Sequence, residues 1–182
     1  MKSSNQNPEV HASSAGHDLA STDWIDMHFQ AMQPEYEQML SWVGIQSNWQ
    51  VLDAGCGTGG YLPLMTELVG NGGKVSAIDL APENVRVVEE RAGQGSWSAP
   101  VDARVGTILD LPYADQSFDA VWCANTSQYL SDTELLTMLQ EFRRIVRPGG
   151  LIAIKEYDIT AMQVQPTMPM LFLHLYEACC RM

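Results

Sequence analysis

The sequence predicts an α/β fold with a mainly parallel sheet and helices on both of its faces. Short apolar runs alternate five times with stretches in which apolar residues recur at helical spacing, the order that produces parallel strands joined by helices. The first of these strands, at 50–54, leads directly into a glycine-rich turn at 55–60 and then into a helical pattern. Strand, glycine turn and helix form the opening unit of nucleotide-binding α/β folds.

The overall composition is that of one ordinary globular domain. The 182 residues are 46% hydrophobic and 18% charged, which is enough apolar material for a sizeable core. The formal net charge of −12 repels phosphate backbones, so we expect no nucleic-acid partner.

The four cysteines do not follow the spacing of a disulfide framework or of a zinc site. Two are isolated and the other two, Cys179 and Cys180, are adjacent. We therefore expect reduced thiols, a cytoplasmic location and no metal site. No apolar run approaches the ~18 residues of a membrane span, and the first residues lack the apolar stretch of a signal peptide.

The N-terminal segments are expected to lie outside the sheet. Residues 1–20 are rich in Ser, Asn, Gln and His and contain little to bury, so they predict a disordered tail. Residues 21–44 predict two short cover helices, one capped by Ser21 and a second that begins near Pro34 and ends at Gly44. Such helices either cover a binding site or only pack on the sheet, and the sequence leaves both readings open.

Residues 45–157 are expected to form the sheet and its connecting helices. The glycine turn is followed by a helix to about Gly70, and Pro82 begins the next helix. Ser131 and Glu134 form a capping box that starts another helix, which ends near Val146. The strands are expected at 50–54, 74–79, 102–105, 118–124 and 151–157.

One crevice is expected at the carboxyl ends of the strands, where sheets of this kind bind their ligands. It would be surrounded by 53–60, Asp79, 106–108 and 124–128. Asp79 lies 20 residues after Gly59, a position from which a carboxylate can accept hydrogen bonds from ribose hydroxyls. Both nicotinamide dinucleotides and S-adenosylmethionine contain that ribose, so these residues alone indicate only an adenosine-containing ligand. The glycine turn is not a P-loop, because no Gly-Lys-Ser/Thr follows it.

Three segments together resemble the class I S-adenosylmethionine-dependent methyltransferases. Residues 51–59 (VLDAGCGTG) resemble the first motif of that family, 111–119 (LPYADQSFD) the stretch before its fourth strand, and 142–150 (FRRIVRPGG) the segment before its fifth. The resemblance is greatest to the group that contains ubiquinone, sterol and small-metabolite methyltransferases. It implies a Rossmann-like fold, S-adenosylmethionine as cofactor, and methyl transfer to a small-molecule acceptor by in-line displacement.

The resemblance also implies which residues hold the methionine end of the cofactor. The backbone of Gly55, Cys56, Gly57 and Gly59 should lie against it, and Asp53 should brace the turn.

The adenosine end is implied in the same way. Asp79 should accept from the ribose hydroxyls, and Leu80 should press on the adenine. Thr107 and Ile108 should meet the adenine edge, and Asn125 should lie beside the methionine and the sulfonium. Asp79 can instead cap the helix at Pro82, and Leu80 can be ordinary core packing.

The sequence departs from the family pattern in two places. Family members commonly have Asp where this chain has Thr107, and Asp110 is a candidate to compensate for the missing charge. The family sheet normally ends in an antiparallel hairpin, but this sequence stops in a predicted helix at 170–181, so we expect the hairpin to be absent. We therefore expect 158–182 to be a substrate cover in a truncated chain, part of a naturally minimal form, or a segment that leaves the edge of the fifth strand to a partner such as a second copy.

The methyl acceptor is not specified by any motif, and the catalytic residues are unknown at this level. Candidate general bases are His28, Tyr36, Tyr129, Glu156 and His174. The methionine-rich segment 162–173 suits a lipophilic acceptor or simply covers the sheet. The alternatives are a non-catalytic S-adenosylmethionine-binding regulatory or assembly protein and, less favoured, an NAD-dependent dehydrogenase.

Overall fold

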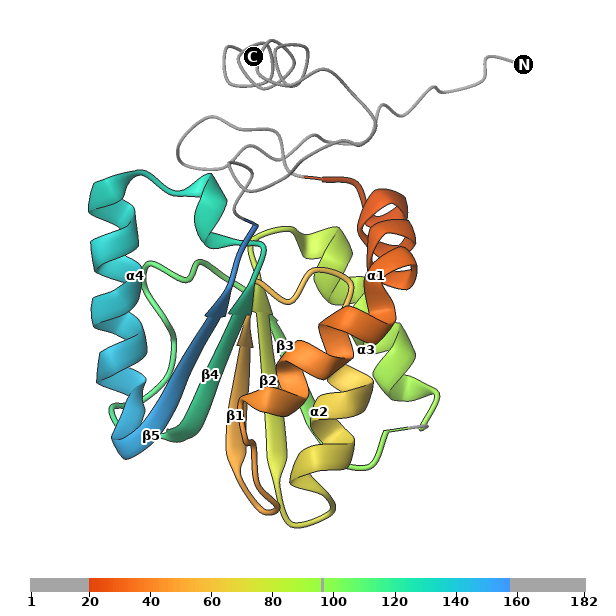
Figure 1. The fold of residues 1–182 in the computed structure, drawn as a ribbon, viewed down its shortest axis with the longest axis horizontal. Helices are drawn as coiled ribbons and strands as arrows, with labels where there is room; N and C mark the ends of the chain where they lie inside the picture. The colour runs from red at the N-terminus through yellow and green to blue at the C-terminus, as the bar shows by residue number, and fades with distance from the viewer. Residues whose placement is uncertain (1–19, 96, 158–182) are drawn as a thin grey trace, which may run out of the picture.

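A computed structural model describes residues 20–95 and 97–157, and their framework is a five-stranded, entirely parallel sheet (Figure 1). The strand order is β3-β2-β1-β4-β5. The strands are β1 (Gln50–Ala54), β2 (Lys74–Asp79), β3 (Val101–Val105), β4 (Phe118–Ala124) and β5 (Val146–Lys155). The predicted fold class is thereby confirmed.

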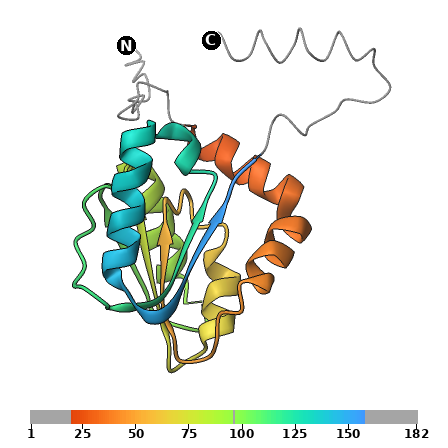
Figure 2. The ribbon, with the colours of Figure 1, turned by 60° about the vertical axis from the view of Figure 1, so that its left-hand side comes forward.

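Helices cover both faces of the sheet. The helices are α1 (Thr22–Trp42), α2 (Leu62–Val69), α3 (Pro82–Gly93), a short 3-10 helix η1 (Ser127–Tyr129) and α4 (Asp132–Ile145). In two views, α1, α2 and α3 lie on one side of the sheet and α4 lies on the other (Figures 1 and 2). The chain crosses from one face to the other between β3 and β4, so the strand order reverses between β1 and β4, where such sheets bind ligands.

The core consists of two apolar layers separated by the sheet. Adjacent residues of β1 illustrate this: Val51 packs with the α1–α3 layer, whereas Leu52 packs with the α4 layer. Both are fully buried. A strand that is covered on both sides has apolar residues on both of its faces, which explains why Val51, Leu52 and Ala54 are all apolar.

The N-terminal region differs from the prediction, because α1 is one helix of 21 residues and not two short ones. Pro34 lies inside it and has no backbone N–H, so the carbonyl of Gln30 receives no hydrogen bond from within the helix. Both residues are exposed, so water can bind the free carbonyl. The helix continues past the proline because Tyr36 and Leu40, on its other face, are buried against the sheet.

The fifth strand also differs from the prediction, since it begins at Val146 and ends at Lys155. Residues 148–150, which the sequence places before the strand, instead form an irregularity within it. Phe118 pairs with Val146 and Ala120 pairs with Leu151, so three extra residues of β5 are accommodated between the two pairs. Gly149, with φ +81°, supplies the left-handed conformation that such a bulge requires.

Several expectations fall outside the described residues: the tail at 1–19, the helix at 170–181, and the presence or absence of a terminal hairpin. The division into tail, cover helices, core and C-terminal segment stays a prediction. Within the described part of the chain, no helix is both long and apolar enough to cross a bilayer.

Candidate functional site

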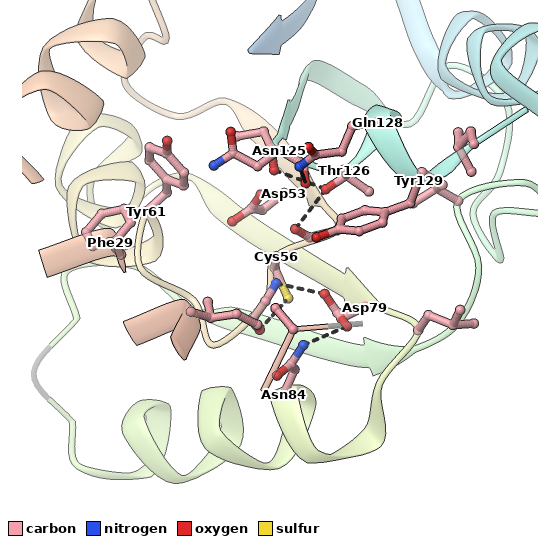
Figure 3. A pocket seen from close by; sticks show the side chains of 18 of the residues that line it. Phe29, Asp53, Cys56, Tyr61, Asp79, Asn84, Asn125, Thr126, Gln128 and Tyr129 are labelled. Carbon is pink, nitrogen blue, oxygen red and sulfur yellow. Dashed lines mark hydrogen bonds between the residues drawn. The ribbon is translucent and has the colours of Figure 1, made fainter. Parts of the chain in front are cut away.

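A pocket of about 330 Å³ opens at the carboxyl ends of the strands (Figure 3). Its walls come from the glycine turn, the loops after β2, β3 and β4, the N-terminal half of α1, and the residues after β5. All but one of the cofactor-binding residues expected from the sequence line it: Asp53, Gly55, Cys56, Gly57, Asp79, Leu80, Thr107, Ile108 and Asn125. The exception is Gly59, where an added Cβ would meet Leu62 and Val88. Lining a pocket does not test a binding role, so these roles stay predictions.

The glycine turn requires glycine for a specific reason at its first position. Gly55 has φ +77°, and a Cβ built on it would lie 2.3 Å from Thr126 Oγ1. The backbone N–H groups of Gly55 and Cys56 both donate to the carbonyl of Ile78, at 2.8 and 3.0 Å. The turn after β1 is therefore held between the end of β2 and the loop after β4.

Asp79, at the end of β2, anchors this turn. Its Oδ2 accepts from the Gly57 N–H at 2.8 Å, and its Oδ1 accepts from the N–H of Ala81 and from Asn84 Nδ2. The bonds from Ala81 and Asn84 are local, as in a helix cap, yet Asp79 also lines the pocket. A carboxylate has about four acceptor positions, so the three bonds leave Oδ2 with capacity for a ligand hydroxyl.

Asp53, near the end of β1, is a buried acid at the base of the pocket. The residue is 1% exposed, and its Oδ2 has no hydrogen-bond partner in the described structure. Burial, reinforced by Asp79, raises its pKa to about 8. A buried carboxylate is costly unless a positive group meets it. Asp53 therefore favours a cationic ligand.

The polarity of the whole lining supports the same conclusion. Among the described residues that line the pocket, none is Lys or Arg. A dinucleotide carries two phosphates, which the paired carboxylates Asp53 and Asp79 would repel. S-adenosylmethionine carries a sulfonium and an ammonium, so the residues that are present fit this cofactor.

Thr107, which is expected at the adenine edge, lies in the loop after β3. Thr107 Oγ1 accepts from the Leu109 N–H at 3.1 Å and lines the pocket. Asp110 is exposed and does not line it, so the expected compensation by Asp110 is not supported by its position. Leu80 is 45% exposed at the pocket wall, whereas Ile108 is buried.

Helix α1 is fastened to the glycine turn by polar contacts that the sequence did not reveal. Thr58 Oγ1 donates to Asp26 Oδ1 at 2.6 Å. Arg91 donates to the Thr58 carbonyl and to Asp26 Oδ2, each at 2.7 Å. The three residues come from α1, the turn and α3, so this contact holds α1 over the pocket.

The opposite end of the pocket is aromatic. Trp24 stacks on His28, with ring centroids 4.5 Å apart, and Phe29 and Tyr61 meet edge to face. Tyr157 follows β5 and reaches His28 Nε2 with its hydroxyl at 3.2 Å. We call these residues, together with Tyr36 and Lys155 behind them, the aromatic half, and we call Asp53, Asp79 and the glycine turn the carboxylate half.

The sequence prediction missed most of the aromatic half. His28 and Tyr36 were candidate bases without a motif, and Lys155 and Tyr157 were not singled out. Only an i, i+4 pairing of Trp24 with His28 on a helix signalled part of it. Of the other candidate bases, Tyr129 lines the pocket, but Glu156 accepts from the Ser127 N–H and hydroxyl. His174 lies outside the described residues.

Cys56 and Cys123 are both buried free thiols, and burial raises the pKa of each above its ordinary value. No group of three His, Cys, Asp or Glu side chains in the described residues is arranged to hold a metal ion.

Three known methyltransferases are similar to this chain in sequence or in structure. A demethylmenaquinone methyltransferase of Bacillus velezensis is 27% identical over 128 residues, covering 70% of this chain and 54% of that protein. A 2-phytyl-1,4-beta-naphthoquinone methyltransferase of Arabidopsis thaliana is 30% identical over 131 residues, covering 71% and 49%. The crystal structure of an S-adenosylmethionine-dependent methyltransferase from Aquifex aeolicus is similar with a TM-score of 0.69 at 26% identity, covering 85% of this chain and 81% of that one.

The chain spans about half the length of the curated relatives it matches. The family model described as a methyltransferase domain matches residues 51–150, which is more than half of the sequence and includes the carboxylate half of the pocket. The protein therefore belongs to the class I S-adenosylmethionine-dependent methyltransferase family.

Proposed function

We propose that this protein transfers the methyl group of S-adenosylmethionine to a small aromatic acceptor. The observation that carries the proposal is the unpartnered Oδ2 of Asp53 in a pocket whose described lining contains no Lys or Arg. When bound, the cofactor supplies an electrophilic methyl group next to a positive charge. The residues of the chain then need mainly to bind, orient and exclude water, and alignment alone is worth roughly 7–11 kcal/mol.

Each part of the carboxylate half has a distinct task in this proposal. The backbone of Gly55 and Gly57 supports the methionine end, while Asp53 provides negative charge for its positive groups. Asp79 accepts from the ribose hydroxyls, and Leu80 and Ile108 hold the adenine between apolar surfaces.

The acceptor is proposed from the aromatic half and from the relatives. Trp24, Phe29, Tyr61 and Tyr157 present flat ring surfaces along the pocket wall, which suit a planar ring. The two curated relatives are named for methylating naphthoquinone-type compounds. We therefore favour a quinol-type acceptor, and a partner that covers the edge of β5 stays part of the proposal.

Calorimetry with S-adenosylmethionine, S-adenosylhomocysteine and NAD tests the cofactor, and mass spectrometry of reduced 1,4-naphthoquinone incubated with S-adenosylmethionine tests the transfer. We expect saturable binding of the two adenosyl compounds, no binding of NAD, and a product heavier by one methyl group. Binding of NAD alone would contradict the proposal. Binding of the adenosyl compounds without transfer to any acceptor in a pool of phenols and quinols would favour a non-catalytic binding protein.

A further inference from the structure

A chain of hydrogen bonds leads from a buried lysine to the pocket. Lys155 is 9% exposed, and its Nζ donates to Asn125 Oδ1 at 2.5 Å. The same ammonium lies over the rings of Tyr36 and Tyr157, 4.2 and 3.8 Å from their centroids. Among the described residues, no carboxylate forms an ion pair with it. Its positive charge is therefore held by an amide and two ring faces beside the aromatic half.

The direction of each bond in this chain follows from the donors that are available. Lysine only donates, so the Asn125 oxygen is occupied and only its NH₂ group is left to face the Tyr36 hydroxyl, whose pKa Asn125 lowers. Tyr36 is buried and hydrogen bonds to the Tyr157 hydroxyl, so Tyr36 donates and Tyr157 accepts. Tyr157 then donates its own proton to His28 Nε2 at 3.2 Å.

This ordering leaves the Tyr157 oxygen with one free acceptor position. A phenolic oxygen has one proton and two lone pairs, of which the proton and one lone pair are used by His28 and Tyr36. Both Tyr157 and His28 line the pocket, whereas Tyr36 and Lys155 lie behind them. A ligand hydroxyl that reaches this end can therefore donate to Tyr157.

We propose that Tyr157 and His28 form a proton-accepting site for the ring hydroxyl of a phenol or hydroquinone, with Lys155 stabilising the resulting oxyanion. This inference rests on the proposed function and specifies its acceptor. In the step, the O–H bond of the acceptor breaks and its proton passes to the Tyr157 oxygen, while the Tyr157 proton passes to His28 Nε2. The electron pair left on the acceptor oxygen forms the new bond to the methyl carbon as the S–CH₃ bond of S-adenosylmethionine breaks, and the electrons of that bond stay on the sulfur of the leaving S-adenosylhomocysteine. His28 later returns its proton to solvent.

The surrounding charges favour an oxyanion over a cationic amine. Burial and Lys155 both lower the pKa of His28, which keeps the imidazole neutral at pH 7 and leaves a ring nitrogen lone pair for the Tyr157 hydroxyl. Burial raises the pKa of Tyr36, so its hydroxyl stays a donor. The titratable groups that face His28 are Tyr36 and Tyr157, whose rings contact its imidazole, and Lys155, which acts on it by charge. Glu156 Oε1 accepts from Ser127, whereas the Lys155 ammonium lies over the Tyr157 ring.

The test uses para-nitrophenol, whose ionised form has its own absorbance band, added to protein saturated with S-adenosylhomocysteine. We expect saturable binding of the phenolate, with an apparent pKa about one to three pH units below that of the free phenol, because a nearby cation favours the charged form. Lys155→Met should remove most of this difference and Lys155→Arg should restore it. Lys74→Met is the matched control, since Lys74 pairs with Asp102 at the other end of the sheet.

Two further variants test the acceptor groups. Tyr157→Phe should weaken phenol binding about two- to tenfold, the effect of one lost hydrogen bond. Tyr113→Phe removes a buried hydroxyl without a partner in the other apolar layer and should change nothing. Calorimetric titrations in buffers of different ionisation enthalpy report how many protons are released when the phenol binds. We expect the wild-type protein to retain the phenol proton and the His28→Asn variant to release it to the buffer.

The outcomes separate this inference from the function on which it rests. If S-adenosylhomocysteine fails to bind by calorimetry, the proposed function is wrong. If it binds but para-nitrophenol does not, or binds only in its neutral form, the oxyanion site is wrong and the proposed function stands. A Lys155→Met variant that weakens S-adenosylhomocysteine, but not methylthioadenosine, would assign the lysine to the cofactor carboxylate and overturn the inference.

Discussion

The two halves of the pocket are built in different ways and carry opposite charge. The carboxylate half comes from the ends of two adjacent strands and one short turn, and Asp53 and Asp79 make it acidic. The aromatic half joins α1 to the residues after β5, so that Tyr36 and Tyr157, 121 positions apart, share a hydrogen bond. Its one described cation is Lys155. The difference suggests that the first half selects the cofactor by positive charge and the second selects the acceptor by ring shape and acidity.

The largest effect is expected from adding a side chain to the glycine turn of the carboxylate half. Gly55→Ala places a Cβ in a left-handed conformation and against Thr126, and strain of this kind costs roughly 1–3 kcal/mol. Binding of S-adenosylhomocysteine, measured by calorimetry, should weaken by about 5- to 150-fold. Gly93→Ala is the control, because nothing lies within 4 Å of its Cβ position at the end of α3. Equal binding by both variants would show that the turn does not form the cofactor cradle.

The next effect concerns the charge of Asp53 and has a specific pH dependence. Its pKa of about 8 lies above the ordinary value of 3.8, so the folded apo protein holds this proton more tightly than the unfolded chain does. Between about pH 4 and 8 the carboxyl of the unfolded chain is ionised while that of the folded apo protein is still protonated. The free energy of unfolding of the apo protein therefore falls as pH rises through this range, and a bound cation offsets that loss. The affinity for S-adenosylmethionine should increase as pH rises through 8.

Asp53→Asn tests this dependence. By calorimetry the variant should bind S-adenosylmethionine roughly tenfold more weakly above pH 8, where a charge-assisted contact is lost, and nearly as well as wild type at pH 6. It should also raise the melting temperature of the apo protein above pH 8. A pH-independent affinity in wild type would remove Asp53 from the cofactor site.

A smaller effect in the opposite direction is expected at the adenine edge. Thr107→Asp gives the position a charged acceptor and keeps an oxygen for the Leu109 N–H, so cofactor binding should tighten by about threefold to tenfold. Asp110→Asn should leave the affinity unchanged, because Asp110 is exposed and outside the pocket. Weaker binding by Thr107→Asp in calorimetry would mean that the adenine lies elsewhere.

The smallest effect is expected from removing the polar contact that holds α1 over the pocket. Asp26→Ala removes the partner of Thr58 and Arg91, and partly exposed pairs of this kind contribute about 0.2–1 kcal/mol. We expect hydrogen exchange to increase in α1 and acceptor binding to weaken by a factor of about two. A larger loss of cofactor binding than of acceptor binding would show that α1 serves the carboxylate half.

The difference between the carboxylate half and the aromatic half also explains how much of the protein could be predicted from its sequence. The sheet, the capping box at Ser131 and the residues of the carboxylate half depend on local patterns such as VLDAGCGTG, and the structure reproduces the strands and places these residues together. The single helix α1 was missed because Pro34 signals a break locally, whereas burial of Tyr36 and Leu40 decides the outcome. The contacts of Tyr157 with Tyr36 and His28 in the aromatic half were missed because they join residues more than 100 positions apart, and no local spacing records them.

A crystal structure with S-adenosylhomocysteine and a phenol tests the division of the pocket most directly. The account predicts the homocysteine end against Gly55 and Gly57, the ribose at Asp79, and the phenol oxygen at Tyr157. Ribose or adenine among Trp24, His28 and Tyr157, with the glycine turn empty, would contradict it.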